Sequence, residues 1–153
     1  MKVSLTVNKP RHEVYAFWRK IENFPLFMKH LKDITVLDPS RSRWELSVLG
    51  DTLPVKWESE IVLDEQNERI GWQSKEGTII ENAGNIHFED AGKFGTEVHA
   101  VISYRAPGGK ITEAIAGLFN PLFENMIRED IKNFKRFIES GVLPTIENQP
   151  FGD

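Results

Sequence analysis

The amino-acid sequence predicts an α+β fold in which a curved, seven-stranded antiparallel sheet grips one long C-terminal helix, with two short helices after the first strand. Three observations support this prediction. Strand-like segments with alternating polarity are separated by turns, a proline-interrupted helical pattern follows the first of them, and the last third of the chain is amphipathic at helical spacing. Because the connections between successive strands are short, we expect antiparallel pairing.

The N-terminal part of the chain predicts one strand and two short helices. Residues 2–8 alternate between apolar and polar side chains, which is typical of a half-buried strand. Pro10 stands where the first turn of a helix tolerates proline. The apolar positions that follow have helical spacing: Val14, Phe17, Trp18 and Ile21. Pro25 interrupts this pattern, so we expect a break near residues 23–25.

Six further strand-like segments fill the middle of the chain. They centre on residues 34–36, 44–48, 55–63, 70–74, 84–88 and 98–104, and most are followed by Gly, Pro, Asp or Asn. Together with the first strand they make seven.

The segment from Thr112 to Ser140 predicts one long helix. Its apolar positions recur at helical spacing: Ile115, Leu118, Phe119, Leu122, Phe123, Met126, Ile127, Ile131, Phe134, Phe137 and Ile138. At about 1.5 Å per residue it extends about 40 Å, so it crosses the whole domain and can leave a space between itself and a curved sheet. Pro121 removes one backbone donor, so we expect it to kink this helix or to separate two helices. The kink either follows the curvature of the sheet or makes residues 112–120 a movable lid, and curvature is the simpler interpretation.

Composition narrows the class of protein. The chain has 153 residues, a formal net charge of −4 and no cysteine, which excludes disulfides and thiolate chemistry and gives no basic face for nucleic acid or anionic lipid. Residues 1–143 are expected to form a single domain, and residues 144–153 a flexible polar tail. With no apolar stretch long enough to insert in a membrane, we expect a cytoplasmic protein, a monomer or a weak homodimer.

Four local segments carry a resemblance to a known family: residues 14–18 (VYAFW), 22–25 (ENFP), 27–31 (FMKHL) and 128–135 (REDIKNFK). With the order of the elements, they resemble bacterial polyketide cyclase/dehydrase-type members of the START-like, or SRPBCC, superfamily. The resemblance covers the chain up to about Ser140 and implies the helix-grip fold. It implies no single activity, because that family label gathers aromatase/cyclases, quinone- and lipid-binding proteins and members of unknown role.

Side chains two apart on a strand share a face, and this alternation yields the candidate ligand-binding residues. The face assigned to the helix carries three of the four tryptophans. Together with residues of the long helix, the candidates that line a cavity are Trp44, Trp57, Ser59, Trp72, Ser74, Phe88, Tyr104, Phe119, Phe123, Met126 and Asp130. Aromatic rings with a few polar tips suit a pocket that orients a largely apolar ligand. The same rings could instead fill the core, and we favour the pocket. No catalytic residue, cofactor or metal is identified.

Asp130 breaks the helical pattern, because it falls near the centre of the apolar arc of the long helix. An ionised carboxylate there is costly unless it is paired or hydrogen-bonded. Asp130 therefore either anchors the helix, by accepting from an indole, a backbone N–H or a cation, or projects into the cavity as a functional group. We favour the anchor.

The opposite face of the predicted sheet is charged. It carries Glu45, Lys56, Glu58, Glu60, Arg69, Gln73, Lys75, Asn85, His87, Glu89, Glu97 and His99. Glu58, Glu60, His87 and His99 could be metal ligands, but charges of both signs favour cross-strand pairs on a solvated surface. His12 and His30 are interpreted as partly exposed residues without a function.

Three functions remain open. The first is binding, for storage, transport or sensing, of a hydrophobic small molecule such as a lipid, quinone or polyketide in an internal cavity. The second is a polyketide cyclase/aromatase or dehydratase that positions its substrate with inward polar residues. The third is an interaction module that docks on a partner through an exposed apolar patch. We favour the first.

Overall fold

A computed structural model describes residues 1–46, 55–75, 80–105 and 121–140, without the side chains of residues 121–123. The elements in chain order are β1 (Lys2–Val7), α1 (Arg11–Arg19), η1 (Ile21–Asn23), α2 (Phe24–Phe27), β2 (Leu31–Val36), β3 (Arg41–Leu46), β4 (Val55–Glu65), β5 (Arg69–Ser74), β6 (Glu81–Asp90), η2 (Gly92–Phe94), β7 (Thr96–Arg105) and α4 (Pro121–Ser140). The strand-rich middle is thus confirmed, and so is the long C-terminal helix over residues 121–140, whereas residues 112–120 of the predicted helix lie outside the described residues.

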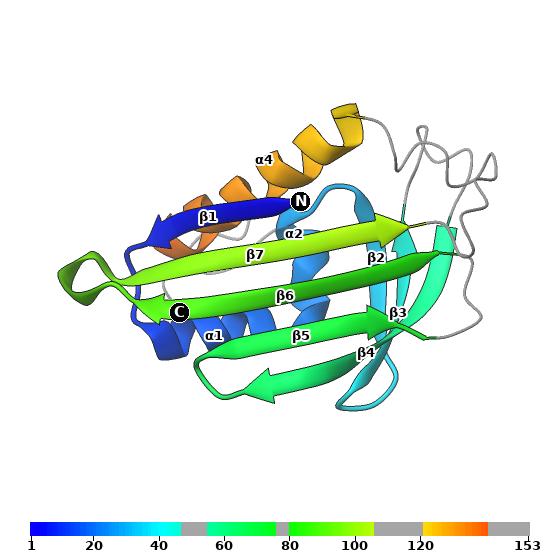
Figure 1. The fold of residues 1–153 in the computed structure, drawn as a ribbon, viewed down its shortest axis with the longest axis horizontal. Coiled ribbons are helices and arrows are strands. Elements are labelled where there is room, and N and C mark those ends of the chain that lie inside the picture. The colour runs from blue at the N-terminus through cyan, green and yellow to red at the C-terminus, as the bar shows by residue number, and fades with distance from the viewer. Residues whose placement is uncertain (47–54, 76–79, 106–120, 141–153) are drawn as a thin grey trace, which may run out of the picture.

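All seven strands form one antiparallel sheet in the order β1-β7-β6-β5-β4-β3-β2. Strands adjacent in sequence from β2 to β7 are also adjacent in the sheet, and β1 closes the order by pairing with β7. Irregular pairing within β2 and within β4 interrupts the register, and such irregularities bend a sheet. Figure 1 shows the curved sheet with the helices gathered behind it.

Helix α4 is fastened to the edge strand β1 by side chains that reach its backbone. Arg128 donates to the carbonyl of Lys2, Lys135 donates to the carbonyl of Thr6, and Glu139 accepts from the backbone N–H of Asn8. Unpaired groups of an edge strand would otherwise offer a template to another chain. The predicted kink at Pro121 and the predicted lid fall partly on residues 112–120, outside the described residues, and stay predictions. The predicted tail also lies outside them.

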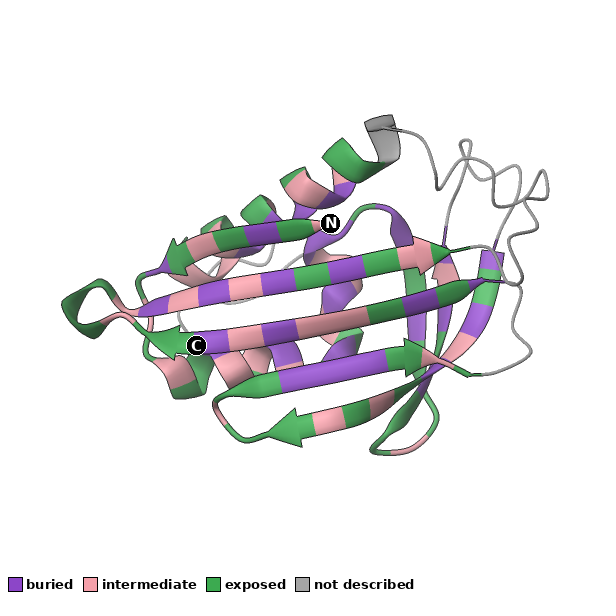
Figure 2. Ribbon diagram, viewed as in Figure 1, coloured by how far each residue is buried: buried purple, intermediate pink, exposed green. Residues whose placement is uncertain are grey.

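The alternation of faces predicted from the sequence is confirmed. Figure 2 shows buried and exposed residues taking turns along β7 and along the bent strands. The three inward tryptophans are only 2–3% exposed, whereas their neighbours on the opposite face, such as Lys56 and Gln73, are exposed. A one-residue register slip would exchange the two faces, so the register is strongly specified.

The two short helices close one side of the sheet with an aromatic cluster. The ring of Trp18 lies 4.9–5.2 Å from the rings of Phe24, Phe27 and Phe134, centroid to centroid. The break between the helices is also confirmed, although α1 ends at Arg19 and η1 precedes α2. Pro25 stands in the first turn of α2, where its missing N–H is tolerated.

Candidate functional site

The inner face of the sheet carries a row of three tryptophans from three adjacent strands. Trp44 on β3 is the cross-strand partner of Trp57 on β4, and the ring centroid of Trp44 lies 5.7 Å from that of Trp57 and 6.0 Å from that of Trp72 on β5. Phe24 of α2 packs edge-on against Trp44 and Trp72. By ring contacts, the order of the row is Trp57, Trp44, Trp72. Phe24 of α2 covers Trp44 and Trp72, and Trp57 stands at the other end of the row.

The three indole N–H groups of this row differ in whether they have a hydrogen-bond acceptor. Trp44 donates to Ser42 Oγ at 2.8 Å, and Trp72 donates to Asn82 Oδ1 at 3.3 Å. Nε1 of Trp57 is buried and has no hydrogen-bond partner among the residues that the structure describes. Burying a donor without an acceptor costs about 1–3 kcal/mol.

Tyr104 lies beside Trp57 and brings a second polar tip to this end of the row. The two rings meet edge to face, with centroids 6.0 Å apart. Burial raises the pKa of the Tyr104 hydroxyl well above its usual value, and the negative charge of Asp130 raises it further. The hydroxyl therefore stays protonated and can donate over the whole physiological range.

Asp130 is buried, as its place on the helix predicts, and its partner is His30. Nδ1 of His30 lies 2.8 Å from Oδ2 of Asp130, and the two side chains are 1% and 3% exposed. An ionised carboxylate only accepts, so Nδ1 then carries the proton. The interpretation of His30 as a partly exposed residue without a function is wrong in its first half, because the segment between α2 and β2 turns this ring inward.

The pair joins two elements far apart in sequence. His30 directly precedes β2, and Asp130 stands in α4, one hundred residues later. The anchoring role expected for Asp130 thus has a concrete partner. The negative charge of Asp130 also acts on Tyr104, so the pair lies within electrostatic reach of the ring that packs against Trp57.

The other predicted site residues divide into three groups. The hydroxyl of Ser59 donates to the carbonyl of Gln73, and that of Ser74 accepts from the backbone N–H of Asn82, so both hydroxyls support the sheet. Phe88 packs edge to face with Tyr15 of α1. Phe88 stands six residues along β6 from Asn82, and Asn82 is the cross-strand partner of Tyr104. At the rise of a strand this separation is about 20 Å, so Phe88 lies far from the end of the inner face that holds Tyr104.

The remaining candidates belong to the long helix. Met126 is partly buried against the core. Phe119 and the side chain of Phe123 lie outside the described residues and stay predictions. The structure therefore brings together Trp57, Tyr104 and Asp130, and adds His30.

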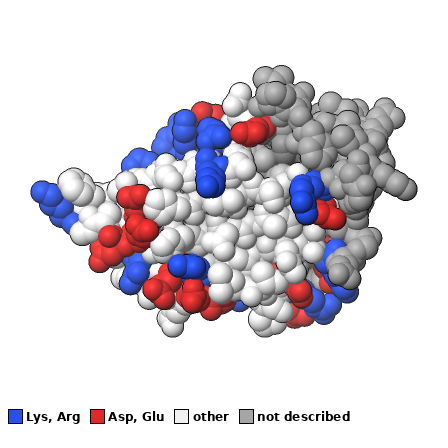
Figure 3. All heavy atoms as spheres, in the orientation of Figure 1, with Lys and Arg blue, Asp and Glu red and all other residues white. Residues whose placement is uncertain are grey.

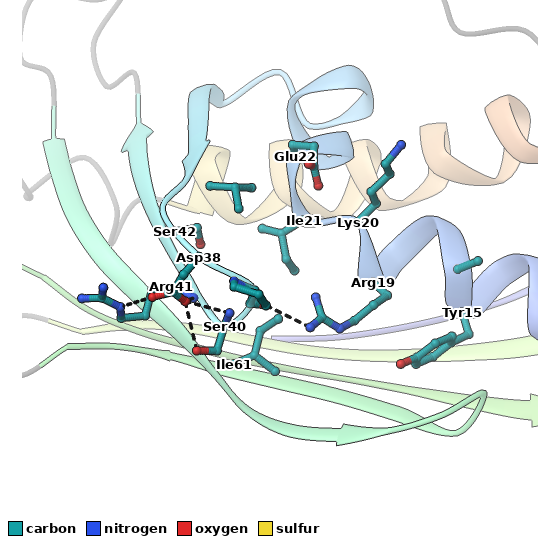
Figure 4. Close-up of a pocket in the computed structure, with 13 residues that line it drawn as sticks. Tyr15, Arg19, Lys20, Ile21, Glu22, Asp38, Ser40, Arg41, Ser42 and Ile61 are labelled. Atoms are coloured by element: carbon teal, nitrogen blue, oxygen red, sulfur yellow. Dashed lines mark hydrogen bonds and ion pairs between the residues drawn. The ribbon is translucent and has the colours of Figure 1, made fainter.

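A separate hollow of about 450 Å³ opens on the surface between α1, the β2–β3 turn and β4. Figure 4 shows it with Tyr15 and Arg19 on one wall, Asp38 and Arg41 on the other, and Lys20 pointing away. Arg19 is held by Asp64 and the carbonyl of Pro39, and Arg41 by Asp38 and Glu58.

Ion pairs hold three of the charged side chains of this surface hollow, Arg19, Asp38 and Arg41, and Lys20 and Glu22 also line it. The hydrogen bonds from Arg41 and from the backbone of Ser40 lower the pKa of Asp38 to about 2. Burial and the hydrogen bond to Asp64 raise the pKa of Tyr15 to about 12. The hollow was not predicted, because several elements form it and no local motif marks it.

Comparison with known proteins identifies the family. A family model described as "Polyketide cyclase / dehydrase and lipid transport" matches residues 7–135. The chain belongs to this family. No curated protein matches the chain. The family thus combines ligand transport and ring-forming chemistry on one fold, and membership alone does not choose between them.

Solved structures of related proteins agree with the family and its fold. A Deinococcus radiodurans protein shares 36% identity, with 90% of this chain and 95% of that chain covered and a TM-score of 0.73. A START superfamily protein from Mycobacterium smegmatis shares 12% identity over 91% of this chain and 93% of its own, with a TM-score of 0.66.

A third structure is the di-domain ARO/CYC BexL from the BE-7585A biosynthetic pathway. It shares 21% identity over 91% of this chain and 46% of its own, with a TM-score of 0.66. At these identities the START protein and BexL show the fold alone. Among the described residues of this chain, no helix is both long and apolar enough to span a membrane.

Proposed function

We propose that this protein binds a largely apolar small molecule, such as a lipid, quinone or polyketide, between the inner face of the sheet and α4. The occupant would contact Trp57 and Tyr104. The observation that carries the proposal is the buried indole N–H of Trp57, which lacks an acceptor among the described residues.

Contrast with Trp18 supports this interpretation. Its Nε1 is also buried without a partner in the described part of the chain, but the Trp18 ring packs against three phenylalanine rings. Weak N–H···π contacts are favourable there. Trp57 instead has aromatic contacts with Trp44 and Tyr104, near the polar pair of His30 and Asp130. A carbonyl or hydroxyl oxygen of an occupant would satisfy its N–H.

Apolar surroundings supply affinity, and the few polar groups supply orientation. Transfer of apolar surface from water yields about 25 cal/mol per Å², so most of the binding free energy would come from the aromatic row. Hydrogen bonds from Trp57 and Tyr104 would fix which end of the molecule enters first.

The proposal is tested first by native mass spectrometry of protein purified without detergent, where we expect a co-purified adduct. Titration with menadione, a naphthoquinone with two carbonyl acceptors, then tests whether the indole N–H of Trp57 contributes to binding. We expect Trp57→Phe to weaken menadione binding about tenfold, the loss of one buried hydrogen bond. Trp18→Phe is the matched control and should bind like the wild type.

The proposal fails if no adduct is found and menadione does not saturate the wild-type protein. It also fails if both tryptophan variants weaken binding equally, because the effect would then come from a general loosening of the core.

A second function, cyclase or dehydratase chemistry, is favoured by the buried pair of His30 and Asp130 beside Tyr104. A histidine held by a carboxylate can accept a proton from a methylene between two carbonyls, and a protonated tyrosine can donate to a carbonyl oxygen. In this case Asp130→Asn should retain binding of a poly-carbonyl probe and lose its turnover. Equal turnover by Asp130→Asn and the wild type would exclude the pair as the catalytic group.

A further inference from the structure

The outer face of the sheet, opposite the proposed binding site, carries a cluster of two histidines and two glutamates. The register places His87 of β6 directly opposite His99 of β7, and Glu89 directly opposite Glu97. Figure 3 shows this face, with acidic side chains gathered at the end where β6 stops and β7 begins. Like charges placed directly opposite each other destabilise a sheet, so this arrangement costs free energy unless a cation compensates it.

Distances within the cluster fit a small divalent metal ion. Nε2 of His99 lies 3.0 Å from Oε1 of Glu97 and 3.8 Å from Oε2 of Glu89, and one donor atom from each residue lies within 4.8 Å of the others. Ligands about 2.0–2.1 Å from a tetrahedral zinc ion are about 3.3 Å apart. These two distances lie on either side of this value, so small side-chain rotations would bring His99 to tetrahedral spacing from both carboxylates.

A hydrogen bond from outside the cluster orients the histidine. Ser4 Oγ on the neighbouring strand β1 lies 2.9 Å from Nδ1 of His99, which leaves Nε2 directed at the carboxylates. Metal-binding histidines are commonly held through their second nitrogen in this way, and loss of such a bond weakens metal binding about 10- to 100-fold.

Within the described part of the chain, no lysine or arginine balances the charge of the cluster. The ion-pair partners of Glu89 and Glu97 among those residues are the two histidines. The nearest cation by register, Arg69 opposite His87, pairs with Glu65.

We propose that Glu89, Glu97 and His99 bind a zinc ion on the outer face, with His87 as the fourth ligand. Nδ1 of His87 lies 3.5 Å from Oε1 of Glu89, within reach after a rotation of the ring. One or two imidazoles with two carboxylates suit zinc better than calcium or magnesium, which take oxygen ligands. The ion would bridge β6 and β7 and stabilise the folded protein increasingly as its concentration rises.

Calorimetric titration of the untagged, chelator-treated full chain with zinc chloride tests the proposal. We expect one zinc ion per chain and a rise in Tm on addition of zinc. His99→Ala should abolish saturable binding, and Glu97→Gln and Ser4→Ala should each weaken it by about tenfold or more. His12→Ala removes an exposed histidine elsewhere and should bind like the wild type.

Cobalt substitution supplies a second readout, because a tetrahedral cobalt site has a characteristic visible absorption that His99→Ala should lack. The proposal is overturned if the wild-type chain shows no saturable zinc binding. It is also overturned if zinc binding persists unchanged in His99→Ala or falls equally in His12→Ala.

Discussion

Two buried tryptophans, each with an indole N–H that no described residue accepts, lie in different surroundings. Trp18 is enclosed by Phe24, Phe27 and Phe134. Trp57 stands at the end of the tryptophan row, beside Tyr104 and the charge of Asp130. The comparison teaches that burial alone does not distinguish the two indoles, and that the polarity of their neighbours does.

The largest loss of stability should come from truncating the enclosed tryptophan, Trp18. Trp18→Ala should lower the free energy of unfolding by about 3–5 kcal/mol, because close packing on all sides leaves a cavity that cannot collapse. Trp57→Ala should lower the free energy of unfolding by less, if one side of the Trp57 indole faces the space that the ligand would occupy. Denaturant unfolding of both variants measures the difference, and equal losses would show that Trp57 is also part of a solid core.

The second-largest loss of stability should come from the buried pair of His30 and Asp130. Asp130→Ala removes the carboxylate that the buried His30 ring faces and should cost about 3 kcal/mol. A double-mutant cycle with His30→Ala isolates the coupling between the two side chains. Additive losses in the cycle would contradict a direct interaction between them.

Gly84 packs against the tryptophan row, and a substitution there tests how tightly the indole of Trp72 is held. A Cβ at this position would clash with Cζ2 of Trp72, its cross-strand partner. Gly84→Ala should therefore displace the indole and cost about 1–3 kcal/mol, with a weaker menadione affinity. Ala83→Ser on the exposed side of the same strand is the control, and a Gly84→Ala variant as stable as this control would mean that Trp72 is free to move.

The smallest effect concerns the two tyrosines, both of which have raised pKa values. Burial and Asp64 raise the pKa of Tyr15 to about 12, and burial and Asp130 raise the pKa of Tyr104. A raised pKa means that the folded state holds the proton more tightly than the unfolded state. For Tyr15 the resulting stability is complete below about pH 10 and is lost as the pH rises through about 12.

Absorbance at about 295 nm measures the ionisation of both rings. The native protein should show no transition near pH 10, and Tyr15→Phe should remove the transition near pH 12. Ionisation of either ring at the ordinary tyrosine pKa in the native state would contradict the contacts described for it.

Sequence periodicity predicted the sheet faces and the place of Asp130, because both depend on local spacing. The partner His30 was missed, since it stands between α2 and β2 where no period applies. The sequence did contain a signal for this pairing. A buried carboxylate requires a hydrogen-bond donor, and the four histidines of the chain were candidate donors for Asp130. The pairing of Glu89 with Glu97 also escaped prediction, because alternation assigns a face and only the register assigns neighbours.

The most direct test of the proposed occupant follows the indole N–H signals of Trp57 and Trp18 by ¹H–¹⁵N NMR during a menadione titration. We predict that the Trp57 signal moves downfield and saturates as its N–H gains an acceptor, while the Trp18 signal stays in place. Saturable binding that leaves the Trp57 signal unmoved, or that moves both signals alike, would contradict a ligand seated at the end of the tryptophan row.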